Sequence, residues 1–482
     1  MGHPWVFSGN RRLVLDPSAL GKRVSALDVV PPPRQQPLPD PDAALHDALR
    51  APIDSPPLRE LARGARRVVV AVPDDSRPCP TPRLLPAVLA ELSAAGVALR
   101  DVQVLIACGV HSTTSADEKA ALVGQDVWGR VRVLDAQGLT QANAFLGQTR
   151  QRAPAFVNLS VALADLVIAI GTVEPHLYAG FSGGAKTVAI GCAGAQTIAW
   201  THSPIFLEQP GVEIGRLAGN PFQEAVRSIA AKTKLCFALD VVVNEDEKVV
   251  ALAAGEPVSV QEKLAGGQRH AWFPTVPERY DVIIAGVPAP KSENFYQASR
   301  AATYLALTDR PALVDDGLIL LAADLPRGAG DGPGERNFAQ LMQQAQDPDS
   351  LIARALHGEP LGPGGQRAYM MAKVMRRYRV GVVSGGHPAG GDRFGSGARP
   401  AGGAHPLSSA QPAASAKRAE PARSAPLPAS ADKTSLSATI GALGCTTYTT
   451  VAEALADEAR RRGRAARVLA VADAITSIVR QA

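Results

Sequence analysis

The sequence predicts an α/β protein made of two α/β domains, each built on a mostly parallel sheet. The chain has 482 residues, which is too long for one ordinary hydrophobic core. Short apolar runs without alternation, such as residues 166–170 and 280–286, are typical of strands buried on both faces. Stretches with helical signals separate these runs, and this alternation of strands and helices is typical of a parallel sheet.

The pattern of the chain also predicts its domain organisation. Residues 1–40 are rich in proline and loosely patterned, so we expect a loosely structured N-terminal segment. An N-terminal α/β domain over residues 41–276 should bind a cofactor, and the pattern restarts for a C-terminal α/β domain over 277–482. Residues 384–438 are mostly low-complexity Gly, Pro, Ala and Ser. Such a segment buries too little apolar surface to become ordered, so we expect a disordered insertion.

The individual elements follow from apolar periodicity and from start and stop signals. In the first domain we expect strands at 68–72, 102–107, 131–134 and 166–170, helices at 42–49, 58–63, 84–95, 195–200 and 222–232, and a hairpin of 237–243 with 248–253. In the second domain we expect strands at 280–286, 317–322, 380–383 and 466–471, and helices at 338–344, 348–356, 366–376 and 448–462.

Composition excludes several classes of protein. Hydrophobic residues make up 46% and charged residues 20%, as in a soluble globular protein. There is no apolar window of 18 residues and no secretory signal, so we expect neither a membrane partner nor export. The net charge of +5 is small, without a basic stripe interleaved with aromatics, so we expect no nucleic-acid partner. Five scattered cysteines without a C-x-x-C pair predict neither disulfides nor a thiolate zinc site, and a cytoplasmic location.

The most informative stretch is the loop that follows the apolar run at 166–170. From Glu174 to Lys186 it reads E-P-H-L-Y-A-G-F-S-G-G-A-K. Its glycines allow positive φ and close approach of the backbone to a ligand, and its serine and free N–H groups suit an anion. Lys186 could be a charge partner or an amine that reacts with a carbonyl or thiocarbonyl carbon. A glycine-rich turn without function is the plainer interpretation.

A second interpretation of this loop is the phosphate-binding loop of nucleotide hydrolases, G-x-x-x-x-G-K-[ST]. Residues 180–187 nearly match it, but Ala185 occupies the second glycine position. Gly180 also lies well beyond the expected strand end at Gly171, whereas a true loop of this kind follows its strand directly. A nucleotide hydrolase remains an alternative function.

Two further polar motifs follow expected strands, where α/β proteins place functional residues. Asp74 and Arg77 follow the strand at 68–72. Asp74 could cap the loop or bind ribose hydroxyls, and Arg77 could bind a carboxylate or phosphate in bidentate fashion. His111 follows the strand at 102–107. Taken alone, these residues could equally form a solvated Asp–Arg turn and a structural histidine.

Together these motifs resemble those of the lactate racemase family, whose members carry a nickel pincer nucleotide. The run E-P-H-x-x-A-G-F-S-G-G-x-K, with His202 sixteen residues after the lysine, resembles the signature of that family. D-x-[ST]-R-P-x-P at 74–80 and G-x-H-x-x-x-[ST]-x-x-E at 109–118 resemble two of its other motifs. The resemblance covers nearly the whole chain, apart from the N-terminal tail and residues 384–438.

The resemblance implies a role for each candidate residue. Lys186 would hold the cofactor covalently through a thioamide, His202 would bind nickel, and His111 and His176 would be the acid/base pair. The residues expected to contact the cofactor are Asp74 and, around its phosphate, Ser182, Gly183 and Gly184. The residues expected to contact the substrate are Arg77 and Arg300, which would bind its carboxylate, and Tyr296 and Gln297, which would orient it.

The implied activity is racemisation or epimerisation of a 2-hydroxy acid by hydride transfer, in a cleft between the two domains. The implied partners are the small-molecule substrate and the proteins that synthesise the cofactor. Arg300 stands where the family has lysine, and arginine differs in reach and planarity. A larger or more polar substrate than lactate is therefore expected. A non-catalytic relative that binds a hydroxy acid or a nucleotide is a further alternative.

Overall fold

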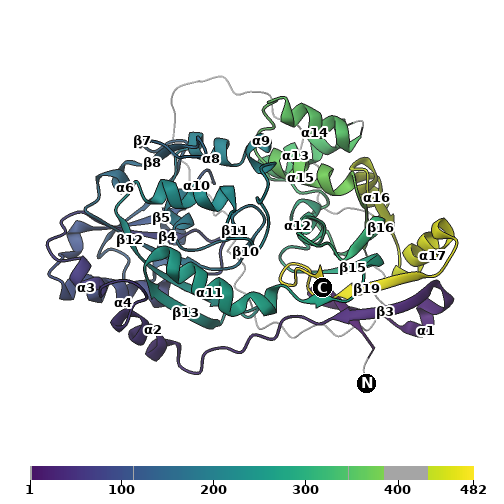
Figure 1. The fold of residues 1–482 in the computed structure, drawn as a ribbon, viewed down its shortest axis with the longest axis horizontal. Coiled ribbons are helices and arrows are strands. Elements are labelled where there is room, and N and C mark those ends of the chain that lie inside the picture. Colours follow the sequence, from purple (N-terminus) through teal and green to yellow (C-terminus); the bar gives the residue numbers. More distant parts are fainter. Residues whose placement is uncertain (1–2, 112, 346, 385–432) are drawn as a thin grey trace, which may run out of the picture.

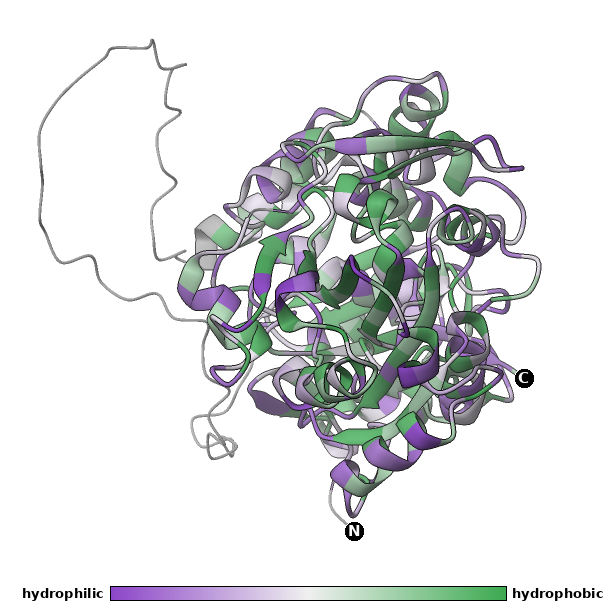
Figure 2. Cartoon of the chain, turned by 90° about the vertical axis from the view of Figure 1, so that its left-hand side faces the viewer, coloured by the Kyte–Doolittle hydropathy of each residue, from purple (hydrophilic) through white to green (hydrophobic). Residues whose placement is uncertain are grey.

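The protein folds into two halves, each organised around its own sheet (Figure 1). The computed structural model describes residues 3–111, 113–345, 347–384 and 433–482. Helices cover the sheets, and the apolar strands lie inside each half while polar residues lie mainly on the outer helices (Figure 2). The prediction of an α/β protein with two mostly parallel sheets is confirmed.

The first half contains a six-stranded sheet in the order β13-β12-β9-β4-β5-β6. All neighbours are parallel except the hairpin of β12 and β13. In chain order the strands are β4 (Val68–Pro73), β5 (Val102–Ala107), β6 (Arg132–Asp135), β9 (Leu166–Thr172), β12 (Leu235–Val243) and β13 (Val249–Gly255). Every residue of β4 and of β9 is buried, which explains their unbroken apolar runs.

Helices and short hairpins complete this half. The helices are α2 (Pro41–Arg50), α3 (Leu58–Leu61), α4 (Thr81–Ala94), α5 (Ala116–Val123), α6 (Leu159–Leu163), α7 (Lys186–Ala189), α8 (Ala195–Thr201), α9 (Pro204–Leu207), α10 (Pro221–Ala230) and α11 (Pro257–Trp272). The short antiparallel pairs are β7 (Asn143–Gln148) with β8 (Pro154–Asn158), and β10 (Pro175–His176) with β11 (Gly180–Phe181).

The second half contains an eight-stranded sheet with the path β18-β17-β16-β15-β1-β2, while β19 pairs with both β15 and β3. Its strands are β1 (Trp5–Gly9), β2 (Arg11–Val14), β3 (Val24–Val30), β15 (Tyr280–Pro288), β16 (Leu313–Ala322), β17 (Arg379–Val383), β18 (Thr446–Tyr448) and β19 (Ala466–Val471). Its longer helices are α12 (Phe295–Ala306), α13 (Pro333–Gln344), α14 (Pro348–Leu356), α15 (Gly365–Met375), α16 (Lys433–Ala442) and α17 (Val451–Arg462).

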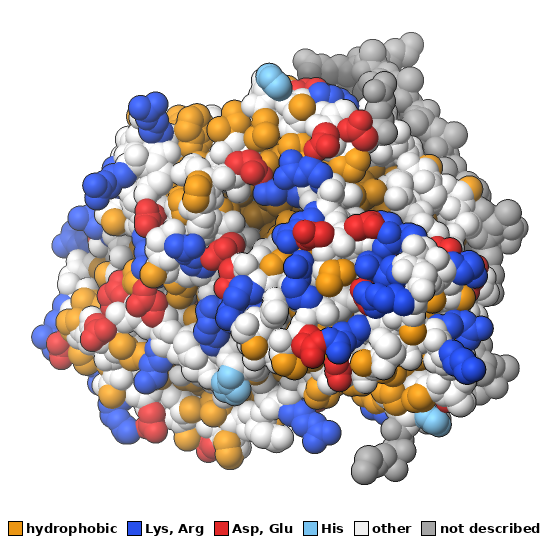
Figure 3. Space-filling view, turned by 45° about the vertical axis from the view of Figure 1, so that its right-hand side comes forward, with side chains coloured by type: hydrophobic (Ala, Val, Ile, Leu, Met, Phe, Trp, Pro, Cys, Tyr) orange, Lys and Arg blue, Asp and Glu red, His pale blue; other side chains and the backbone are white. Residues whose placement is uncertain are grey.

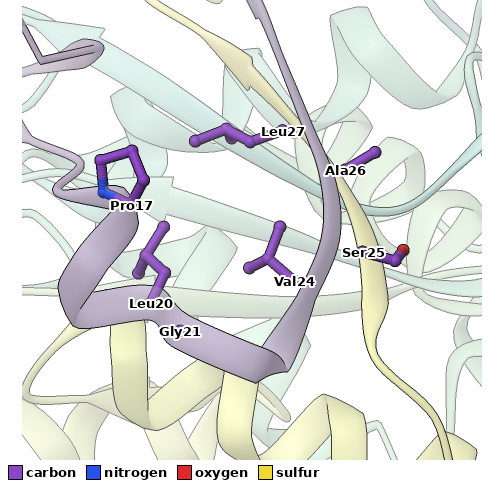
Figure 4. A pocket seen from close by; sticks show the side chains of 7 residues that line it. All are labelled: Pro17, Leu20, Gly21, Val24, Ser25, Ala26 and Leu27. Atoms are coloured by element: carbon purple, nitrogen blue, oxygen red, sulfur yellow. The ribbon is translucent and has the colours of Figure 1, made fainter.

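The N-terminal segment differs from the prediction for residues 1–40, because three strands form there. β3 pairs in parallel with β19, and β1 pairs with the end of β15. β3 is mostly exposed or half-buried, so it lacks the continuous apolar run that marks a central strand. The second sheet is thus built from both ends of the chain. Near its edge, a cavity of about 220 Å³ is lined by Pro17, Leu20 and Val24, among others, and by no charged side chain (Figure 4).

The region around the predicted insertion also differs in part. Residues 385–432 of the predicted disordered segment lie outside the described residues. Its last residues, however, begin helix α16, in which Leu436 and Ile440 lie one turn apart and are buried. Tertiary packing of this apolar pair therefore outweighs the weak helix propensity of the segment. Strand β18 stands where the start of a helix was expected, and that helix, α17, begins at Val451.

On the face shown in Figure 3, basic and acidic side chains are intermixed. In the described parts of the chain, no helix is long and apolar enough to cross a membrane. All five cysteines are free thiols in this structure.

Candidate active site

The three motifs are brought together because the strands that precede them are neighbours. β4 pairs in parallel with both β5 and β9, so the carboxyl ends of these strands lie at the same edge of the sheet. The Asp74–Arg77 loop follows β4, His111 follows β5, and the loop that ends at Lys186 follows β9. The sequence therefore placed these candidate residues at the correct edge.

Asp74 connects two of the motifs. Its Oδ2 lies 2.7 Å from Nδ1 of His111, and its Oδ1 accepts hydrogen bonds from the backbone N–H and the hydroxyl of Ser76, at 3.2 and 2.5 Å. Burial acts to raise the pKa of Asp74, but the hydrogen bonds from His111 and Ser76 hold it below its ordinary value. The carboxylate is therefore ionised and fixes the Nδ1–H tautomer of His111. The other ring nitrogen, Nε2, is left as a proton acceptor on a side chain that is 65% exposed.

Arg77 forms an ion pair with Glu174, the first residue of the E-P-H motif. Burial acts to lower the pKa of Arg77, but the negative charge of Glu174 raises it. Both side chains are about one third exposed. Glu174 lies two residues before His176, and its role was not predicted from the sequence. In this structure Glu174 is the acid that balances Arg77.

His176 lies on the β10–β11 hairpin with its tautomer fixed by the backbone. Its Nδ1 accepts hydrogen bonds from the N–H groups of Tyr178 and Ala179, at 3.3 and 3.2 Å. A neutral His176 therefore carries its proton on Nε2. Burial lowers the pKa of His176 well below its ordinary value, and the positive charges of Lys186, Arg77, His202 and Arg300 lower it further. These residues of both halves therefore lie around one imidazole.

Lys186 is the first residue of the short helix α7 and is half-buried. Among the residues that the structure describes, none forms a hydrogen bond or an ion pair with its Nζ. Burial and, after it, the charge of Arg77 lower the pKa of Lys186 to about 7. A substantial fraction of this amine is thus neutral and nucleophilic near pH 7.

His202 caps the C-terminal end of helix α8, as the predicted helix at 195–200 implied. Its Nδ1 lies 3.0 Å from the carbonyl oxygen of Ile198, which can only accept, so Nδ1 carries the proton. The lone pair of Nε2 is then available to a metal ion. Burial and the charge of Lys186 lower the pKa of His202 to about 4, which keeps the imidazole neutral at physiological pH. Within the described ranges, no three His, Cys, Asp or Glu side chains lie close enough to form a metal site.

The glycine-rich loop is held from beneath by a residue that the sequence analysis missed, Asp240 on β12. Its Oδ2 accepts a hydrogen bond of 2.5 Å from the backbone N–H of Gly184, and its side chain is fully buried. A Cβ atom added at Gly183 would lie 2.9 Å from the same oxygen. Burial raises the pKa of Asp240 to about 7. The glycines thus allow the loop to approach this carboxyl group and the core.

Two of the three residues predicted to surround a cofactor phosphate, Ser182 and Gly184, have hydrogen-bond partners within the protein. The hydroxyl of Ser182 donates to the carbonyl oxygen of Thr172 at 2.7 Å and accepts from the N–H of Glu174 at 3.0 Å. The N–H of Gly184 is taken by Asp240. These hydrogen bonds stabilise the conformation of the loop itself. The carboxyl group of Asp240 beneath the loop disfavours the binding of a phosphate there. The same geometry disfavours the nucleotide-hydrolase alternative, since the helix after the loop, α7, has only four residues.

Helix α12 supplies the candidate residues of the second half. Tyr296 and Arg300 are four residues apart on this helix, so they share a face. Arg300 contributes to the lowered pKa of His176, which places α12 opposite the β10–β11 hairpin. Gln297 Oε1 is buried without a hydrogen-bond partner in the described structure. Of the three candidate residues on α12, Gln297 therefore has a polar atom free to bind a ligand.

Known proteins that are similar to this chain share the segments that form the candidate site. The family model for the lactate racemase N-terminal domain matches residues 20–215, which include all the strand-end motifs. Lactate racemases from Thermoanaerobacterium thermosaccharolyticum and Lactiplantibacillus plantarum are both 29% identical to this chain, over 70% of it and 78% of each relative. Residues 20–215 of this chain therefore match the lactate racemase N-terminal domain, and the chain is similar to lactate racemases over 70% of its length.

A solved structure of the lactate racemase apoprotein from T. thermosaccharolyticum has the same fold. It matches with a TM-score of 0.78 at 22% sequence identity, and the match covers 99% of each chain. A Thermotoga maritima protein matches less closely, with a TM-score of 0.52 at 18% identity over 68% of this chain and 87% of that one. The lactate racemase fold therefore extends over both halves of this protein.

Proposed function

We propose that this protein is a racemase or epimerase of 2-hydroxy acids that works with a nickel pincer nucleotide. The observation that carries this proposal is that the imidazoles of His176 and His202 both contact the rings of Tyr178 and Phe222, and that the charge of the unpaired Lys186 acts on both imidazoles. Its curated relatives are lactate racemases. Such a protein would depend on other proteins to synthesise its cofactor, and its substrate would be a small hydroxy acid.

The residues present fit this cofactor. Lys186 has a half-buried amine with a pKa of about 7 and no partner among the described residues, which suits a covalent attachment through a thioamide. His202 would offer a neutral Nε2 to nickel, a metal for which imidazole is a suitable ligand. When bound, the group would supply an acceptor for the hydride on the carbinol carbon. Asp74 would contact it from the β4 loop.

His111 and His176 would transfer the proton of the substrate hydroxyl group. His111, with Asp74 on Nδ1, presents Nε2 as a base that can take the proton from the substrate hydroxyl. His176 presents Nε2–H as a donor to the same oxygen. Return of the hydride to the opposite face would require the two imidazoles to exchange these roles.

The arginines would bind the substrate. Arg77, oriented by Glu174, and Arg300 would bind the carboxylate, and Tyr296 and Gln297 would orient the hydroxy acid. Removal of the substrate hydrogen as a hydride avoids a carbanion next to a carboxylate. Enclosure between the two halves would protect the keto acid from water.

The test is a screen of single enantiomers of 2-hydroxy acids, with protein produced together with the cofactor-synthesis proteins. We expect loss of optical rotation with the loaded wild type and none with Lys186→Ala. In D2O the substrate should keep its hydrogen on the carbinol carbon. A loaded protein that interconverts no hydroxy acid would overturn the proposal and favour a non-catalytic binding protein. Deuterium on that carbon would contradict the hydride route.

A further inference from the structure

Three basic side chains of the second half, near Tyr296, lie close enough to act electrostatically on one another, and none of them forms an ion pair with an acidic residue of the described structure. They are Lys291 in the loop after β15, Arg300 on α12 and Arg367 in the first turn of α15. Among the described residues, none of the three forms an ion pair or a side-chain hydrogen bond. Two nitrogens of Arg367, Nε and Nη1, are buried without a partner. A buried guanidinium without an acceptor is costly and points to a missing ligand.

The three side chains surround the predicted substrate residues. Cζ of Arg367 lies 5.1 Å from the centre of the Tyr296 ring, and Arg300 is one turn from Tyr296 on the same helix face. Burial and then the charge of Arg367 lower the pKa of Arg300 to about 10. Burial and then the charge of Arg300 lower the pKa of Lys291 to about 7. The three groups are thus close enough to repel one another.

The charges near this cluster do not balance. Glu174 acts on Lys291, but its carboxylate is already in an ion pair with Arg77. Arg300 and Arg367 alone carry two positive charges, and the single carboxylate of a simple 2-hydroxy acid would offset only one of them. A ligand that carries a second anionic group would offset more of this charge and would give Arg367 its missing acceptors.

We propose that Arg367 and Lys291, next to the carboxylate-binding Arg300, form a subsite for a second anionic group, so that the substrate is a 2-hydroxy acid with a further carboxylate or phosphate. This inference rests on the proposed function and narrows its substrate class. Arg367 would be the main determinant of specificity, because its planar guanidinium can bind a carboxylate or phosphate through two parallel hydrogen bonds.

The test compares matched substrates on the loaded protein. Malate carries a second carboxylate, 3-phosphoglycerate carries a phosphate, and 2-hydroxybutyrate has the chain length of malate without its second charge. We expect kcat/KM for malate or for 3-phosphoglycerate to exceed that for 2-hydroxybutyrate by about 100-fold, the size of effect given by charge-assisted hydrogen bonds. Arg367→Gln should remove most of this preference. Arg376→Gln, at an exposed position just beyond the same helix, should retain it.

A binding measurement separates this inference from the proposed function. Titration calorimetry of the apoprotein should show that malate or 3-phosphoglycerate binds at least about tenfold more tightly than 2-hydroxybutyrate, and that Arg367→Gln abolishes the difference. If this holds while no hydroxy acid is racemised, the subsite stands and the proposed function fails.

Two results would overturn the subsite. The first is that 2-hydroxybutyrate and both anionic substrates are turned over equally fast, and that Arg367→Gln does not change these rates. This result would leave the proposed racemase function intact. The other is loss of covalently bound cofactor from Arg367→Gln, measured by intact mass, with unchanged discrimination among the ligands. That result would assign the basic cluster to the cofactor.

Discussion

Asp240 Oδ2 accepts the backbone N–H of Gly184 at 2.5 Å, two residues before the candidate attachment lysine. This buried contact ties the glycine-rich loop to strand β12, and it accounts for glycines that the sequence alone assigned to a phosphate. Its other oxygen, Oδ1, has no partner within the described structure. The loop that positions Lys186 therefore depends on one buried acid.

We predict that Asp240→Ala destabilises the protein and displaces the loop. The substitution leaves the Gly184 N–H buried without an acceptor, which costs about 1 to 3 kcal/mol. Urea unfolding should show this loss, and the amount of covalently bound cofactor should fall with it. Asp240→Asn, which keeps an acceptor of the same shape, is the matched control and should lose much less stability.

The same residue predicts a pH dependence of stability. The folded pKa of Asp240 is raised to about 7 from an ordinary value of 3.8. The folded state therefore binds more protons than the unfolded state between these values, and the contribution of Asp240 to stability falls as pH rises from about 4 to 7. Unfolding free energies at pH 5 and pH 8 should show a smaller difference in Asp240→Asn. An unchanged difference would show that Asp240 is not the titrating group.

Lys186 should show the opposite dependence in the apoprotein. Its folded pKa of about 7 is below the ordinary value of 10.5, so the unfolded state binds more protons between these values. Its contribution to stability therefore rises as pH rises from about 7 to 10.5. Lys186→Met should stabilise the apoprotein at pH 7 by about 1 kcal/mol or more, since it removes a poorly solvated charge. Equal or lower stability of this variant in urea would contradict the unpaired state of the lysine.

Asp74→Asn should slow turnover without releasing the cofactor. The amide would no longer impose the Nδ1–H tautomer on His111, so Nε2 would lose part of its population as a base. We expect kcat to fall by about 10- to 100-fold, which is the usual cost of losing such an orienting partner. Intact-mass measurement of the loaded variant should show a full cofactor adduct. A lost adduct would make Asp74 a cofactor residue only.

His176 should remain neutral throughout the physiological range. Because burial and neighbouring positive charges lower its pKa well below 6.5, its protonation should not limit the rate between pH 6.5 and 8. His176→Gln should lower kcat by about 100-fold or more, as expected for loss of an acid/base group. Rate profiles against pH for both proteins test this, and near-normal turnover in the variant would remove His176 from the mechanism.

The sequence correctly predicted strands at the centre of a sheet, and it correctly located motifs formed by residues that are close together in the chain. The strands β4 and β9 were predicted because they are buried on both faces, and the motifs at their ends were correctly placed at one edge. β3 was missed because an edge strand with exposed positions has no such run, and its partner β19 lies at the other end of the chain.

The parts of the site that were missed depend on contacts between distant residues. The loop glycines indicated a close approach, but the group that approaches is a carboxyl 56 residues further along the chain. Arg367 resembles any polar residue of an amphipathic helix until the fold brings it over Tyr296. Residue types and spacing cannot reveal such pairings.

The most direct test of the central claim is peptide mapping by mass spectrometry of protein produced with the cofactor-synthesis proteins. We predict one covalent adduct, located at Lys186, with nickel retained in the wild type and reduced in His202→Ala. Racemase activity in a protein without any adduct, or an adduct on a different residue, would contradict the proposal.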